Sequence, residues 1–147
     1  HRHGITVMLW GRLGADHLIL LSAAVGDPLR SIHAELGLRG PLLSGSMGRL
    51  FAAGLDPKIV RRMFNAVDWQ KPLDFPTYMD QVQEAAARGW ALDAGYFNQA
   101  IWGISAPILH PGAALDRVVT AVLLADKQDD TTIGRIAADL IAVARTR

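Results

Sequence analysis

Apolar residues recur along this chain first with the short period of strands and then with the longer period of helices. Residues 5–10 and 17–24 are short apolar segments on either side of a glycine-rich turn, which is typical of a β-hairpin. Residues 29–36 alternate imperfectly between apolar and polar side chains and indicate a third strand. The first part of the chain is therefore expected to supply strands.

Helical spacing replaces strand spacing in the middle of the chain. A first helix is expected within residues 40–54, where apolar side chains recur at helical intervals. A second begins at Asp56 and Pro57, which form an N-cap followed by proline at the first helical position. A third covers residues 76–88 and ends before a glycine, the residue that most often terminates helices.

Strand spacing then returns before a last helix. Residues 90–97, 100–109 and 116–126 are strand-like, and a Pro-Gly turn joins the last two. The final helix follows residue 130, and its apolar stripe consists of Ile133, Ile136, Ala137, Leu140, Ile141 and Ala144. Strands, helices, strands and a helix in this order predict an α+β fold, with a largely antiparallel sheet and helices packed on it.

Composition narrows the class of protein. The 147 residues are the usual size of one domain, and the net charge of +1 disfavours a general nucleic-acid or membrane-surface binder. Cysteine is absent, which removes disulfides and thiolate sites and fits an intracellular protein. No apolar run approaches the roughly 20 residues that cross a bilayer. We therefore expect a cytoplasmic protein without a membrane partner.

The segment 40–54, GPLLSGSMGRLFAAG, contains the small residues that several kinds of site use. A phosphate loop needs Gly-Lys followed by a hydroxyl residue, whereas Gly48 is followed by Arg49 and no hydroxyl. A nucleophile elbow needs Gly-x-Ser-x-Gly after a strand, whereas Ser44 occupies the first glycine position around Ser46. The pattern disfavours both sites, and a small serine hydrolase that uses Ser46 remains the alternative function.

Patterns for metals, cofactors and catalysis are not found elsewhere in the sequence. His17, His33 and His110 are dispersed and lack the spacing of a zinc site or of a base beside a serine. We therefore predict no catalytic residue, no metal ligand and no cofactor, and we expect that the protein is not an enzyme.

Small residues at the start of a helix have two interpretations. The free N–H groups of a helix N-terminus suit an anion, particularly a carboxylate. Small residues also let a helix approach a sheet closely, and composition alone favours this packing interpretation. Both remain open at this point.

Three motifs, taken in order, resemble the effector-binding domain of IclR-type transcriptional regulators. That family shows a Pro-Leu-His-x-(Ser/Thr)-x-x-Gly-Lys-Ala helix start, an Arg-Gly-Tyr step into an acidic turn, and an Ala-Ala-Pro-Ile strand. The corresponding segments here are residues 41–53, 88–93 and 105–108. The resemblance extends over nearly the whole chain.

The resemblance implies a GAF-like fold, in which helices flank a curved antiparallel sheet. It also implies that residues 1–147 are a single effector-binding domain, and that the winged helix-turn-helix domain that binds DNA in this family is absent from this chain. By the same analogy, the domain binds a small-molecule effector and forms homo-oligomers, either dimers or tetramers. Binding to DNA would then occur only through a domain outside these residues.

The resemblance also implies which residues form the effector pocket. Family members commonly carry His, a small residue and Lys where Leu43, Met47 and Arg49 stand here. These differences disfavour a very small polar effector, and imply an aromatic or longer acid or a neutral apolar compound. A ligand-free oligomerisation module is the third possible function. The implied pocket residues are Ser46, Met47, Asp93, Ile101, Gly103, Leu123 and Ala125.

Overall fold

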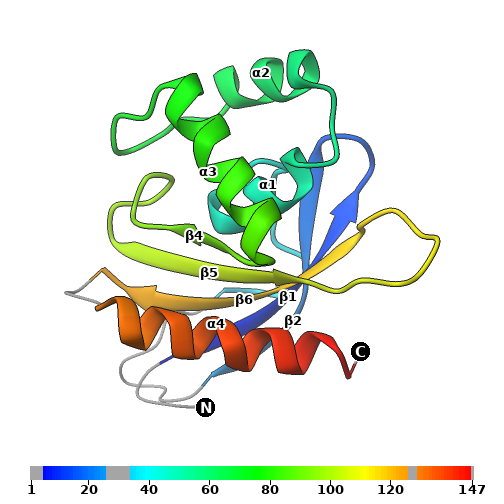
Figure 1. Cartoon of the computed structure of the whole chain (residues 1–147), viewed down its shortest axis with the longest axis vertical. Coiled ribbons are helices and arrows are strands. Elements are labelled where there is room, and N and C mark those ends of the chain that lie inside the picture. Colours follow the sequence, from blue (N-terminus) through cyan, green and yellow to red (C-terminus); the bar gives the residue numbers. More distant parts are fainter. Residues whose placement is uncertain (1–4, 26–33, 126–128, 147) are drawn as a thin grey trace.

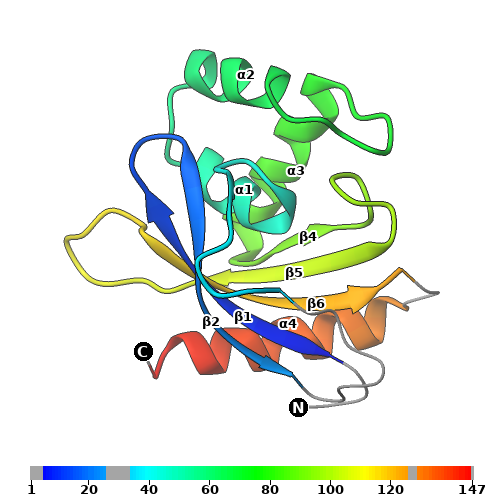
Figure 2. The ribbon, with the colours of Figure 1, turned by 180° about the vertical axis from the view of Figure 1, so that it is seen from behind.

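The computed structural model describes residues 5–25, 34–125 and 129–146, and within them one curved sheet carries helices on both faces (Figures 1 and 2). The strands lie in the order β3-β2-β1-β6-β5-β4, and each neighbouring pair is antiparallel. The predicted α+β fold with a curved antiparallel sheet is confirmed. The strands are β1 (Thr6–Leu13), β2 (His17–Val25), β3 (Arg39–Pro41), β4 (Ala91–Asp93), β5 (Ile101–Pro107) and β6 (Arg117–Leu124).

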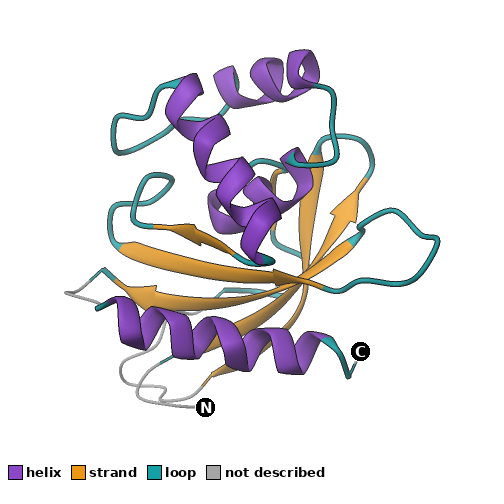
Figure 3. Ribbon diagram, viewed as in Figure 1, coloured by secondary structure: helices purple, strands orange, loops and turns teal. Residues whose placement is uncertain are grey.

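The helices divide between the two faces of the sheet (Figure 3). α4 lies along one face, while α1 and α3 pack against the other and α2 lies outside them. The helices are α1 (Gly45–Ala52), α2 (Pro57–Asn65), α3 (Phe75–Arg88) and α4 (Asp130–Ala144). The predicted N-cap of α2 at Asp56 is confirmed, and so is the end of α3 at Gly89, which has a left-handed φ of 87°.

Two predicted strands differ from the observed ones. The expected third strand at 29–36 begins outside the described residues, and its last three residues form no strand. The third strand is instead β3, at the edge of the sheet. Pro41 has no N–H group to donate, which an edge strand tolerates because one of its sides has no neighbouring strand. The expected strand at 90–97 is only three residues long, because the carboxylate of Asp93 accepts the N–H group of Tyr96 at 2.7 Å and turns the chain.

The face covered by α4 is filled with apolar side chains. Alternate residues of β6, namely Val119, Ala121 and Leu123, point to this face, because successive side chains of a strand point to opposite sides. They pack against the predicted stripe of α4, of which Ala137 and Leu140 are buried. Burial of these side chains removes apolar surface from water and holds α4 on the sheet.

The opposite face is covered less completely. The intervening residues of β6, Val118, Thr120 and Val122, point to this side, where α1 lies across β5. Gly48 lets α1 pack closely on the segment that precedes it, because a Cβ atom there would collide with the main chain of Leu43. The contacts of α1 with the sheet are mainly with β4 and β5.

Candidate functional site

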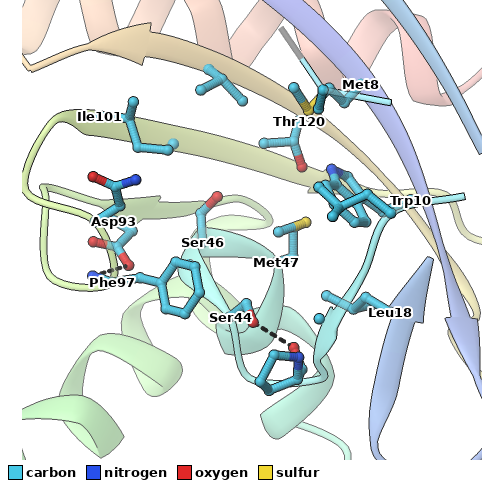
Figure 4. Close-up of a pocket in the computed structure, with 18 of the residues that line it drawn as sticks. Met8, Trp10, Leu18, Ser44, Ser46, Met47, Asp93, Phe97, Ile101 and Thr120 are labelled. Atoms are coloured by element: carbon cyan, nitrogen blue, oxygen red, sulfur yellow. Dashed lines mark hydrogen bonds between the residues drawn. The ribbon is translucent and has the colours of Figure 1, made fainter. Parts of the chain in front are cut away.

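A cavity of about 410 Å³ lies between the sheet and the first turn of α1 (Figure 4). The lining residues come from strands across the whole sheet, from edge strand β3 to edge strand β4. The loop that precedes β3 and the turn that follows β4 complete the walls. The exposed surface inside it is almost entirely apolar. Its main apolar lining consists of Met8, Trp10, Leu18, Met47, Phe97, Ile101 and Val122.

Five of the seven residues implied by the family resemblance line this cavity. Ser46 and Met47 lie at the first turn of α1, Asp93 at the end of β4, and Ile101 and Gly103 on β5. Their sequence separations are large, so the sheet topology brings them together. Whether they bind an effector remains a prediction.

Leu123 and Ala125 do not line the cavity. Leu123 is 7% exposed and packs against α4 on the other face of the sheet. Ala125 follows β6, is exposed, and donates its N–H group to the carbonyl oxygen of Ala100 at 2.8 Å. Leu123 belongs to the alternate set of β6 side chains that faces α4, because neighbouring residues of a strand point to opposite faces of the sheet. The cavity positions of β6 are Thr120 and Val122.

The first residues of α1 line the cavity and carry main-chain N–H groups that the helix itself does not use. Its N-cap residue, Ser44, makes no side-chain bond to the helix and instead donates its hydroxyl to the carbonyl oxygen of Pro41 at 2.6 Å. The first N–H group of α1 that makes a main-chain hydrogen bond is that of Gly48, and its acceptor is the carbonyl oxygen of Ser44. Within the described part of the chain, the N–H groups of residues 45–47 therefore have no acceptor.

Three buried hydroxyl groups form a chain beside these N–H groups. Ser46 Oγ lies 2.7 Å from Ser105 Oγ, which lies 2.7 Å from Thr120 Oγ1. Ser46 and Thr120 line the cavity, so both ends of the chain adjoin it. Gly103 makes this arrangement possible, because a Cβ atom there would lie 2.9 Å from the Ser46 hydroxyl.

A buried ion pair lies beneath the same helix start. Arg49 is 1% exposed and donates to Asp93 at 3.1 Å and to the carbonyl oxygen of Gly45 at 2.8 Å. Its guanidinium also bonds to the side chain of Gln81 on α3 and lies 5.1 Å from the ring centre of Tyr78. Burial raises the pKa of the Tyr78 phenol well above its ordinary value, so this ring stays neutral beside the pair.

Asp93 is fully engaged by protein groups. Its two oxygens accept bonds from the N–H groups of Tyr96 and Phe97 as well as from Arg49. The carboxylate therefore orients the turn after β4, which places Phe97 in the cavity wall (Figure 4). Its negative charge is compensated by Arg49.

A second arginine lies at the cavity rim. Arg39 on β3 is exposed and lines the cavity, and its guanidinium has no ion pair or hydrogen bond with any described residue. Together with the helix N-terminus, this unpaired cation makes the cavity favourable for negative charge.

The cavity also holds an unpaired donor on β1. Trp10 is 8% exposed, and its Nε1–H group has no acceptor within the described ranges. An indole N–H can only donate, so a partner must come from outside these residues. Trp10, Thr120 and Val122 were not among the pocket residues expected from the sequence, although the polar Thr120 within the apolar β6 was a readable signal.

Ser46 lacks the neighbours of a catalytic nucleophile. Its hydroxyl is paired with Ser105, not with a histidine. Of the histidines in the described residues, His17 bonds to exposed Asp16, and His110 is exposed in the loop between β5 and β6. No described histidine thus stands as a general base for Ser46.

Comparison with known sequences gives no assignment. No protein-family model matches the chain, and no curated protein matches it. Within the described residues, no helix is both long enough and apolar enough to cross a bilayer.

Solved structures of transcriptional regulators share the fold. An IclR transcriptional regulator from Alicyclobacillus acidocaldarius has a TM-score of 0.83 at 23% identity, over 97% of this chain and 59% of that one. The repressor BlcR from Agobacterium tumefaciens has a TM-score of 0.78 at 19% identity, over 97% of this chain and 58% of that one. The C-terminal domain of the Escherichia coli regulator KdgR has a TM-score of 0.73 at 16% identity, over 97% of this chain and 84% of that one. At these identities the likeness shows the fold, which is the fold that the resemblance implied. This chain spans less than two thirds of the first two regulators.

Proposed function

We propose that this chain is the effector-binding domain of an IclR-type transcriptional regulator, and that its cavity binds a small organic acid with an aromatic or longer apolar body. The observation that carries the proposal is the uncapped start of α1, which opens into a cavity lined by apolar side chains. The shared fold of regulators supports the class of protein.

The carboxylate of the acid binds at the first turn of α1. The N–H groups of residues 45–47 donate to it, and the positive end of the helix dipole favours its charge. The hydroxyl of Ser46 adds a further donor, and Arg39 at the rim attracts the anion. Asp93 does not repel the ligand strongly, because Arg49 compensates its charge.

The apolar body of the acid fills the rest of the cavity. Met47, Ile101 and Val122 surround this space, so each buried methylene contributes about 0.8 kcal/mol to binding. Acids of two or three carbons leave most of the 410 Å³ unfilled. Aromatic and medium-chain acids therefore bind more tightly than glyoxylate or pyruvate.

The remaining properties of the regulator follow from the same proposal. The domain forms a dimer or tetramer, acts in the cytoplasm, and contacts DNA only through a separate domain. This chain alone then shows no sequence-specific DNA binding at physiological salt, because its net charge of +1 offers few phosphate contacts. Analytical ultracentrifugation at tens of micromolar protein tests the oligomer, and a monomer there would count against it.

We further propose that the domain is not catalytic. Ser46 has a hydroxyl neighbour in place of a base, so its reactivity is that of an ordinary alcohol. A fluorophosphonate probe should leave Ser46 unlabelled, and labelling would favour the serine hydrolase.

A thermal-shift screen tests the proposal. Phenylacetate and hexanoate should stabilise the protein, since a ligand at a hundred times its Kd adds about 2.7 kcal/mol to folding. Phenylacetamide is the control for the charge, and pyruvate and glyoxylate are controls for the apolar body. Stabilisation by the two small acids alone would contradict the proposal, and so would equal stabilisation by phenylacetate and its amide.

A further inference from the structure

The indole N–H group of Trp10 marks a second polar position in the cavity, away from the start of α1. Trp10 lies on β1, and its side chain is more than nine-tenths buried (Figure 4). No described residue accepts its proton. A buried donor without a partner is costly, so the ligand that fills the cavity is expected to supply an acceptor there.

Thr120 is the polar side chain beside this donor. β1 pairs with β6 so that Met8 lies opposite Thr120, and Trp10 is therefore its diagonal neighbour on the same face of the sheet. Trp10 and Thr120 both line the cavity. A ligand group placed between these two side chains can therefore contact a donor and a hydroxyl together.

The hydrogen bonds among the three hydroxyls determine whether Thr120 is a donor or an acceptor toward a ligand group. The three hydroxyls carry three protons, and two of these are used in the bonds at Ser105. When Ser46 donates its proton to a carboxylate at α1, Ser105 must donate to Ser46 and Thr120 must donate to Ser105. The oxygen of Thr120 then faces the cavity as an acceptor only.

A donor and an acceptor side by side are complementary to a hydroxyl group. A ligand hydroxyl accepts from Trp10 Nε1 and donates to Thr120 Oγ1. A carbonyl, ether or halogen accepts from the indole but places its own lone pairs against those of Thr120. Only a hydroxyl or a similar N–H-bearing acceptor satisfies both groups.

We propose that the effector is a hydroxy acid, with its carboxylate at the first turn of α1 and its hydroxyl between Trp10 Nε1 and Thr120 Oγ1. This inference rests on the proposed function of the cavity and names the ligand class more closely. Trp10 and Thr120 are then specificity-determining residues, while the start of α1 provides the charge recognition common to all acids.

Isothermal titration with matched ligands tests the inference. The ligands are phenylacetate, its three ring-hydroxylated isomers, and the methoxy counterpart of each isomer. At least one hydroxylated isomer should bind about tenfold more tightly than phenylacetate. Its methoxy counterpart should lose this gain, because it accepts a hydrogen bond but cannot donate one.

Variants of the two residues assign the gain to the proposed position. Trp10→Phe and Thr120→Val should each reduce the affinity ratio of the hydroxylated isomer to phenylacetate to about twofold or less, whatever either substitution does to the affinity for phenylacetate itself. Trp90→Phe is the matched control, because Trp90 lies on the α4 side of the sheet, and it should retain the full advantage. In the wild-type protein, the indole N–H resonance of Trp10 should move downfield with the hydroxylated isomer and hardly with phenylacetate.

The outcomes separate this inference from the proposed function. Binding of phenylacetate with no gain from any hydroxylated isomer overturns the hydroxy-acid inference and leaves the proposed function in place. A gain that survives Trp10→Phe and Thr120→Val also overturns it. Absence of binding by every acid overturns both.

Discussion

The two faces of the sheet carry helices that begin in different ways. On one face, α4 starts at Asp129, whose carboxylate accepts the N–H group of Thr132 at 2.7 Å, and its apolar stripe packs against the strands. On the other face, α1 starts at Ser44, whose hydroxyl turns away to Pro41. The start of α4 is therefore capped by a side chain, whereas the start of α1 has unpaired N–H groups and lies at a cavity.

This difference separates the part of the molecule that holds the fold from the part available to a ligand. α2 and α3 also have aspartate caps, at Asp56 and Asp74. The one described helix whose N-cap side chain makes no bond to it is therefore the helix at the cavity. The unpaired groups of α1 are thus located where a ligand can satisfy them.

The largest effect on the free energy of unfolding is expected at the buried ion pair of Arg49 and Asp93, which lies beneath the start of α1. Arg49→Met leaves Asp93 buried without its cation, which should lower the free energy of unfolding by about 3–5 kcal/mol. Arg49→Lys should cost less, because the charge is kept. Urea denaturation measures both, and Arg62→Met, on the exposed side of α2, is the control with a change below about 0.5 kcal/mol. A loss of similar size in the control would show that Arg49 has no special role.

Substitution of two valines of β6, one on each face of the sheet, compares the contributions of the two faces to stability and to acid binding. Val119→Ala, on the α4 face, should lower the free energy of unfolding by about 2 kcal/mol and leave acid binding unchanged. Val122→Ala removes methyl groups that already border the cavity, so its cost should be about half as large. The second variant alone should weaken phenylacetate binding. Equal effects of both variants on binding would contradict the assignment of the two faces.

Closing the start of α1 should abolish the difference between the helices. In Ser44→Asp the new carboxylate can accept the N–H groups of α1 as Asp129 does in α4, and it should weaken acid binding at least about tenfold through competition and repulsion. Asp56→Asn, at the surface cap of α2, is the control and should leave binding unchanged. Calorimetric titration with phenylacetate measures the change. Unaltered affinity in Ser44→Asp would place the carboxylate elsewhere.

The smallest effect concerns the capped helices in acid. The main-chain N–H groups of Thr77 and Thr132 lower the pKa of Asp74 and Asp129 below their ordinary value. These caps therefore stabilise the fold fully above about pH 4, and this contribution is lost as the pH falls through the lowered folded-state pKa values. Replacing both by Asn should make the free energy of unfolding less dependent on pH between about 5 and 2. An unchanged slope would show that the two caps do not contribute.

The sequence predicted the regular part of the fold and most of one wall of the cavity. The apolar stripe of α4, the N-cap at Asp56 and the helix end at Gly89 depend on local patterns, and local patterns can be read directly. Ser46, Met47, Asp93, Ile101 and Gly103 were placed at the cavity by family resemblance. The pattern alone left open whether the small residues at α1 serve packing or a ligand.

The remaining features depend on strand register and on contacts between distant residues. After Arg117, β6 is apolar on both of its alternating sets except at Thr120, so its periodicity alone does not say which set faces α4. The pairing of Arg49 with Asp93 joins residues 44 positions apart, and the donor of Trp10 is unpaired only because of what surrounds it in space. Such properties follow from packing rather than from any single segment.

Titration of the backbone amide resonances with phenylacetate tests most directly whether the uncapped start of α1 binds the acid. We expect the largest chemical-shift changes at the N–H groups of Ser46 and Met47, and little change at Lys58, Thr77 and Thr132, which are bonded to aspartate caps. Phenylacetamide should produce much smaller changes at Ser46 and Met47. Saturable binding of phenylacetate that leaves these two resonances unmoved, or no binding at millimolar concentration, would contradict the account.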